Sequence, residues 1–145
     1  MANRIRELGY GECQTLLGLG IIGRAAVMTP DGPHIVPVNY WTVRESVIMR
    51  TTPYSVLGRY ANDAVIAFEV DSLDAARNSG WSVVARGRAE AVTDAKELSD
   101  LCEEITSEPW APGARSMYLR LAYAELSGRS LSAHVLTTGE VDGRR

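Results

Sequence analysis

Alternating apolar and polar residues dominate the chain and predict a protein built mainly from β-strands. In the segment 81–92, every second residue from Trp81 to Ala89 is apolar or small, and most residues between them are polar. Because successive side chains of a strand point to opposite faces, this pattern predicts one packed and one solvent-facing side. Further strands are predicted at 21–28, 34–43, 47–51, 64–71, 117–126 and 130–135.

Two amphipathic segments interrupt the strands and predict short helices. The first, 11–17, carries Glu12 in its first turn and ends near two glycines. The second, 94–108, has apolar residues at helical spacing and is followed by Pro109, which cannot continue a helix. Both helices are expected to cover part of the sheet.

Strands joined mostly by hairpins predict a small antiparallel barrel, mainly β with short helices. The turn sequence Thr29-Pro30-Asp31-Gly32 marks one of these hairpins. The length of 145 residues fits one domain, which we place at 1–145. Within it, the polar, glycine-containing segment 136–145 is predicted to be a loose C-terminal tail.

Charge and composition exclude several classes of protein. Fifteen basic and eighteen acidic residues give a net charge of −3, which argues against a broad nucleic-acid surface. The sequence contains no signal peptide pattern and no apolar run of membrane-spanning length, so we expect a cytoplasmic protein. Cys13 and Cys102 lie far apart and are expected to be free thiols, buried or half-buried. The two histidines have no ligand partners at metal-binding spacing, and no metal site is predicted.

Recognisable catalytic constellations are absent from the sequence. Glu69 and Asp71 flank Val70 on a predicted strand and so share a face. We interpret them as a solvated or edge-strand pair, with an acid–base dyad as the alternative. No serine sits in a nucleophile elbow, and there is no glycine-rich phosphate loop. The sequence therefore identifies no catalytic residue.

The most suggestive polar segment is the predicted strand-to-helix junction at 50–55. Thr52 is placed to act as the N-cap of a helix that begins at Pro53 and runs to Tyr60. A helix N-terminus presents unpaired N–H groups and can hold a phosphate. The charged and hydroxyl groups beside it are Arg50, Thr51, Thr52 and Ser55. The same pattern also fits a capped helix without a ligand.

Seven short motifs occur in a fixed order along the chain. They are Gly23-Arg24-Ala25-Ala26, Pro37-Val38-Asn39-Tyr40, Arg50-Thr51, Ala67-Phe68-Glu69-Val70-Asp71, Gly80-Trp81-Ser82-Val83-Val84, Arg86-Gly87 and Pro109-Trp110-Ala111-Pro112-Gly113. Each motif is weak alone, but together they resemble the pyridoxamine 5′-phosphate oxidase-like, FMN-binding split-barrel family. The resemblance extends from about Glu12 to Gly128.

The resemblance implies a six-stranded antiparallel split β-barrel that forms a homodimer, with two FMN sites in clefts between the subunits. It implies that the flavin phosphate is held by Arg50, Thr51, Thr52 and Ser55. The isoalloxazine ring is implied to lie along the backbone and side chains of Val38, Asn39 and Tyr40, with contacts from Trp81 and Ser82. The residues implied to reach the site from the partner subunit are Trp110 and Arg115.

One position departs from the family pattern. A lysine is common on the helix just after the Arg-Thr strand, where this chain has Val56. Arg59, three residues further on, is expected to replace the missing charge in part. Three interpretations remain open. They are an FMN-dependent oxidoreductase acting on an unidentified small molecule, a non-catalytic flavin-binding or sensor dimer with weakened or lost cofactor binding, and a deazaflavin (F420)-dependent reductase.

Overall fold

The computed structural model describes residues 4–105 and 116–132. The elements in chain order are β1 (Arg4–Glu7), α1 (Tyr10–Leu17), β2 (Ile22–Thr29), β3 (Gly32–Val43), β4 (Ser46–Thr51), α2 (Val56–Tyr60), β5 (Ala64–Asp74), β6 (Ser79–Ala91), α3 (Ala95–Glu104) and β7 (Met117–Ser132). All strand pairings are antiparallel, which confirms the prediction of a mainly β protein with short helices. None of the helices in these ranges is long and apolar enough to cross a membrane.

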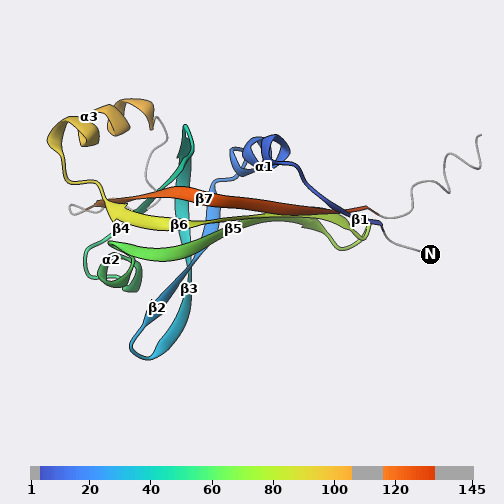
Figure 1. Cartoon of the computed structure of the whole chain (residues 1–145), viewed down its shortest axis with the longest axis horizontal. Coiled ribbons are helices and arrows are strands. Elements are labelled where there is room, and N and C mark those ends of the chain that lie inside the picture. Colours follow the sequence, from blue (N-terminus) through green and yellow to red (C-terminus); the bar gives the residue numbers. More distant parts are fainter. Residues whose placement is uncertain (1–3, 106–115, 133–145) are drawn as a thin grey trace, which may run out of the picture.

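The strands form one seven-stranded sheet in the order β1-β7-β4-β3-β2-β5-β6, and β6 also pairs with β7. The last strand in this order, β6, therefore forms hydrogen bonds with β7, near the start of the order. Strand β1 pairs with the end of β7. The arrangement is not an even barrel: β5, β6 and β7 lie together along the molecule, and the β2–β3 hairpin crosses them (Figure 1). The structure thus confirms the antiparallel, mainly β character of the barrel predicted from the sequence, and the β6–β7 pairing joins the six strands β2 to β7 in a closed order.

Strand β3 changes its partner halfway along its length. Its first part pairs with β2 as far as Asn39, opposite Ile22, and its last part, Tyr40 to Val43, pairs with β4. Strand β2 in turn pairs with β5 over Arg24 to Ala26. This exchange of partners explains why the hairpin projects from the rest of the sheet, and it places Asn39 at the point of divergence.

Two strands differ from the sequence-based prediction. Strand β1 was not predicted, because its four residues are all exposed and show no apolar alternation; pairing with β7 holds it in place. Strand β7 is one strand, although two were predicted on either side of Gly128. A side chain at Gly128 would begin 2.8 Å from the Ser82 carbonyl oxygen and 2.9 Å from the Cys13 sulfur, so the glycine allows this close approach without ending the strand.

Helix α3 begins as predicted but is shorter. Its N-cap is Asp94, whose carboxylate accepts an N–H group from the first turn at 3.1 Å. The helix ends before Ile105, which takes an extended conformation, so it does not fill the predicted range 94–108. Leu101 faces the sheet and is buried, whereas Cys102 is exposed, contrary to the expectation for that thiol. The predicted tail, 136–145, lies outside the described residues.

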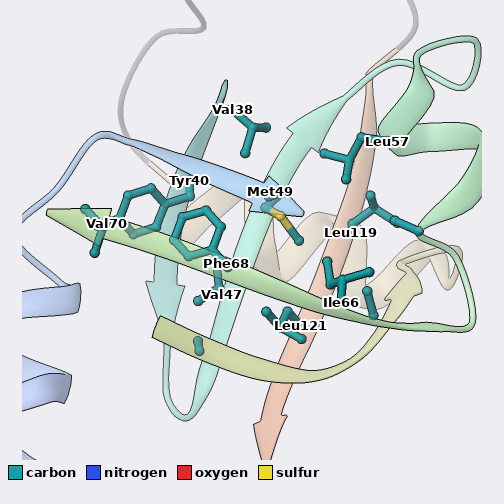
Figure 2. Packing of buried hydrophobic residues seen from close by; sticks show 14 of the residues in the cluster. Val38, Tyr40, Val47, Met49, Leu57, Ile66, Phe68, Val70, Leu119 and Leu121 are labelled. Atoms are coloured by element: carbon teal, nitrogen blue, oxygen red, sulfur yellow. The ribbon is translucent and has the colours of Figure 1, made fainter. Parts of the chain in front are cut away.

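The centre of the core is an aromatic pair formed by Tyr40 and Phe68, seen side by side in Figure 2. Their ring centroids lie 4.7 Å apart in an edge-on arrangement. A side chain at Gly23 would begin 2.0 Å from the Phe68 ring, so this position must lack one. The Tyr40 hydroxyl donates a hydrogen bond to the Leu17 carbonyl, and burial raises the pKa of Tyr40 to about 12. Helix α1 is thereby tied to the core.

Candidate functional site

The connection between β4 and α2 uses a different cap from the predicted one. Helix α2 begins at Val56, and its N-cap is Ser55, whose Oγ accepts the Gly58 N–H at 2.9 Å. The prediction of Thr52 as the cap is therefore wrong. The reason is a close fold-back: a side chain at Gly58 would begin 2.1 Å from the Thr52 carbonyl oxygen, which places Thr52 beside the helix instead of at its start.

The hydroxyl groups of Thr51, Thr52 and Ser55 differ in their hydrogen bonds. The Ser55 hydroxyl donates to the Thr52 carbonyl at 2.8 Å, so in the 2.6 Å contact between Thr51 and Ser55 the donor is Thr51. Both hydroxyl protons are thus used to shape the loop. The Thr52 side chain is exposed and its hydroxyl has no hydrogen-bond partner in the described part of the chain. Because α2 is only five residues long, its dipole adds little to an anion site.

Two arginines flank the β4–α2 connection in the sequence: Arg50 lies near the end of β4, and Arg59 lies in the last turn of α2. Arg50 is half-buried, and its Nε donates to the Ser116 hydroxyl at 2.8 Å. Arg59 donates to the Tyr60 hydroxyl at 3.3 Å and lies over the Tyr60 ring. Within residues 4–105 and 116–132, neither arginine has a carboxylate at ion-pair distance. Arginines that do pair with acids are Arg6, Arg24, Arg77, Arg86, Arg88 and Arg120.

Replacing Ser55 with alanine is expected to destabilise the protein by about 1 kcal/mol, the usual cost of losing an N-cap. The change also removes the acceptor of the Thr51 hydroxyl. Thr52→Ala serves as the matched control and should leave the unfolding free energy nearly unchanged, because its hydroxyl caps nothing. Urea denaturation of both variants measures the difference. A larger loss of unfolding free energy from Thr52→Ala than from Ser55→Ala would show that Thr52 is the N-cap, as the sequence predicted.

Three of the predicted ring contacts lie on β3, on two different faces. Val38 and Tyr40 are buried in the core, so only their backbone is left to line a ligand. Asn39 is half-buried and points to the opposite face. The register that pairs Tyr40 with Met49 places Asn39 next to Arg50, one residue further along. The structure thus brings Asn39 and the phosphate-binding candidates to the same end of β4.

Trp81 and Ser82 lie far from that end. Twelve residues of β7 separate Tyr118, the partner of Arg50, from Ser130, the partner of Trp81, which is on the order of 40 Å along an extended strand. Figure 1 shows β7 running the length of the molecule between these ends. A flavin nucleotide is too short to bridge this distance. One chain alone therefore does not unite the predicted site residues.

Trp81 and Ser82 also occupy opposite faces of β6, as neighbours on a strand must. Trp81 packs against the core, and Ser82 lines a pocket of about 460 Å³ where β1, β6 and β7 meet.

The two residues predicted from the partner subunit, Trp110 and Arg115, lie outside the described residues. Val56, at the position of the common lysine, is half-buried and packs against the core.

Glu69 and Asp71 share a face of β5, as predicted, and a single arginine holds both. Arg24 lies 2.9 Å from the Glu69 carboxylate and 3.3 Å from that of Asp71. Partial burial, together with a hydrogen bond and repulsion from Asp71, raises the pKa of Glu69, and Arg24 opposes this shift. The two acids thus form a partly exposed ion-paired cluster with Arg24, on a strand that pairs on both sides.

Comparison with known proteins decides the family. Residues 10–130 match the family described as pyridoxamine 5′-phosphate oxidase. This protein belongs to the pyridoxamine 5′-phosphate oxidase family. The match covers most of the chain and confirms the resemblance inferred from the seven motifs.

One relative in sequence and two solved structures are similar to this member of the pyridoxamine 5′-phosphate oxidase family. The chain is 38% identical over 103 residues to the uncharacterized protein Rv0080 of Mycobacterium tuberculosis, covering 68% of each. It is 28% identical to the FAD binding protein from Mycobacterium smegmatis, with a TM-score of 0.78 over 88% of this chain and 99% of that one. A FAD-binding protein from Mesorhizobium loti shares the fold, with a TM-score of 0.70 at 23% identity, over 91% of this chain and 100% of that one.

Proposed function

We propose that this protein binds a flavin nucleotide and carries out two-electron redox chemistry on a small molecule, as a homodimer with flavin sites shared between subunits. The observation that carries the proposal is that Arg50, near the end of β4, and Arg59, in the last turn of α2, have no acidic partner in the described residues. Flavin-binding relatives of the same fold support it.

The β4–α2 connection suits the phosphate of such a nucleotide. A phosphate carries about −1.5 to −2 charges near neutral pH and is bound best by guanidinium and hydroxyl donors. Among the described residues Arg50 is held by Ser116 through Nε alone, which leaves its terminal N–H groups for a ligand. The Thr52 hydroxyl and Arg59 would add further donors. Ser55 and Thr51 would contribute by fixing the shape of the loop.

Completion of the site by a second copy of the chain follows from the separation of the predicted contacts. Asn39 and Arg50 lie at one end of β7, and Ser82 lies at the other end. A partner subunit could place its Ser82 near Arg50, whereas one chain could not. In this arrangement Trp110 and Arg115 remain candidates for further contacts from the partner.

An exposed apolar face offers a surface for this dimer. The side chains of Met28, Ile35 and Val65 are 64%, 72% and 60% exposed. They point outward from the adjacent strands β2, β3 and β5, where Ala26 pairs with both Ile35 and Ala67. Apolar patches of this kind often mark protein interfaces. The face continues along β3 to Asn39 and so reaches the proposed flavin site.

The chain's own residues would bind and orient the cofactor. When bound, the flavin supplies the hydride chemistry. Arg50 and Arg59 would balance the charge of its phosphate, the β3 backbone at Val38 and Tyr40 would line the ring, and Asn39 would offer an amide to its polar edge. The buried aromatic pair behind β3 keeps this wall rigid.

A second candidate is a flavin-binding sensor without catalytic activity. The observation that favours it is Val56, which packs against the core at the position where the family resemblance implies a lysine. Loss of one charge-assisted contact weakens phosphate binding by roughly 1.5–3 kcal/mol. A deazaflavin (F420)-dependent reductase is the third candidate.

Titration of the purified protein with FMN, FAD, F420 and riboflavin tests these functions. We expect FMN or FAD to bind, with riboflavin weaker by roughly tenfold or more because it lacks the phosphate. Reduction of the bound flavin by a nicotinamide cofactor supports the oxidoreductase, and binding without reduction by any donor supports the sensor. Selective binding of F420 supports the third candidate. Failure of all four ligands to bind contradicts the proposal.

A further inference from the structure

A second pocket lies at the end of the molecule opposite Arg50. It has a volume of about 390 Å³ and opens between α1 and the ends of β1, β6 and β7. Its lining residues are Arg6, Leu8, Glu12, Thr15, Leu16, Trp81 and Ser130. This volume falls in the range of sites that bind small organic molecules.

One face of helix α1 forms a wall of the pocket. Cys13 and Leu17 are buried in the core. Glu12, Thr15 and Leu16, which follow helical spacing on an adjacent face, line the pocket. The helix start is fixed on both sides, because the Leu8 N–H donates to the Gly128 carbonyl at 2.9 Å and Glu12 accepts the Gly9 N–H at 3.2 Å. The wall is therefore formed before any ligand arrives.

The charged groups of the pocket neutralise each other. The two terminal nitrogens of Arg6 donate to the two carboxylate oxygens of Glu12 at 3.0 and 2.9 Å. These hydrogen bonds, together with that from Gly9, lower the pKa of Glu12 to about 2, so the pair stays ionised near neutral pH. The pocket thus offers no unpaired charge to a ligand. An anion or a cation would have to break the pair.

The half-buried Trp81 lines the pocket together with Leu8 and Leu16. Ser130 lies directly opposite Trp81 across the β6–β7 pairing. Neither the indole N–H nor the Ser130 hydroxyl has a hydrogen-bond partner among the residues that the structure describes. The pocket therefore combines an aromatic surface and apolar walls with two groups that can bond to a polar edge.

We propose that this pocket binds a neutral, flat aromatic molecule, with its ring on Trp81 between Leu8 and Leu16 and its polar edge at Ser130. The proposal does not rest on flavin binding. Because the pocket lacks a free cation, it does not suit the phosphate of a flavin nucleotide, and because Trp81 and Ser82 face opposite ways, a ring on Trp81 does not touch Ser82.

The test uses N-phenyl-1-naphthylamine, a neutral aromatic probe that fluoresces in apolar surroundings, added to flavin-free protein. We expect saturable binding, at least several-fold tighter than that of 8-anilinonaphthalene-1-sulfonate, which carries a negative charge. The variant Thr15→Tyr fills the pocket mouth from an exposed helix position and should weaken binding about tenfold. Thr93→Tyr, at an exposed position outside the pocket, is the matched control and should bind like the parent protein.

Thr15→Arg repeats the test if the tyrosine variant does not fold. The proposal is overturned if the probe does not bind saturably, if it binds both Thr15 variants as tightly as the parent, or if the charged probe binds equally well. Displacement of the neutral probe by FMN would show that the pocket is part of the flavin site, which also overturns it. Probe binding in a protein that fails to bind flavin would support this proposal and contradict only the proposed function.

Discussion

Replacement of Phe68 by alanine is expected to lower the free energy of unfolding by about 3–5 kcal/mol. Phe68 is fully buried, its ring packs edge-on against Tyr40, and it occupies the space left by the missing side chain at Gly23. Its removal would leave a cavity between strands that cross one another, where the backbone cannot collapse to fill it. Urea denaturation at constant protein concentration measures the loss.

The control for this prediction is Leu73→Ala, on the same strand. The Leu73 side chain is 69% exposed, so the change should alter stability by less than about 0.5 kcal/mol. If Phe68→Ala costs less than about 1 kcal/mol, the ring is not packed as described and the position of β3 over β5 needs revision.

Replacement of Arg50 by alanine is expected to weaken FMN binding by about 1.5–3 kcal/mol, or roughly 10- to 150-fold. The guanidinium is half-buried and has no carboxylate partner in the described residues, so its charge is available to a phosphate. Riboflavin lacks the phosphate and should bind the variant and the parent protein equally well. Quenching of flavin fluorescence gives both affinities.

Arg77→Ala is the matched control for Arg50, since it removes the same charge from an exposed position paired with Asp74. It should change neither affinity. Equal weakening of FMN and riboflavin by Arg50→Ala would assign Arg50 to the ring wall or to folding, and the phosphate assignment would then be dropped.

Much of the fold could be predicted because burial imposes a period of two on the strands. The alternation from Trp81 to Ala89 is the alternation of packed and exposed residues in β6. Strand β1 could not be predicted in this way because all its residues are exposed and show no alternation. It is a strand because its backbone pairs with β7. The cap of α2 was misplaced because Thr52 and Ser55 both suit the role; the fold-back at Gly58 decides between them, and this contact is not visible in the sequence.

The candidate site could be predicted as a set of residues but not as an arrangement. The motifs place Arg50 and Ser82 in one family pattern, and the match over residues 10–130 confirms the family. The length of β7 then separates the two residues within one chain. The ring was expected to lie along the backbone and side chains of Val38 and Tyr40, and because the structure buries both side chains in the core, only their backbone is left for it. The partner contacts that the resemblance implied, Trp110 and Arg115, lie outside the described residues.

The shared site is tested most directly by flavin content in a mixed dimer. Arg50→Ala and Ser82→Tyr variants with different affinity tags are co-expressed, and only the dimer that carries both tags is purified. If Arg50 of one subunit and Ser82 of the other form one site, each homodimer should bind FMN poorly. The mixed dimer should regain half of the FMN content of the parent protein, because one of its sites is intact. A mixed dimer that binds no more FMN than the two homodimers would contradict the shared site.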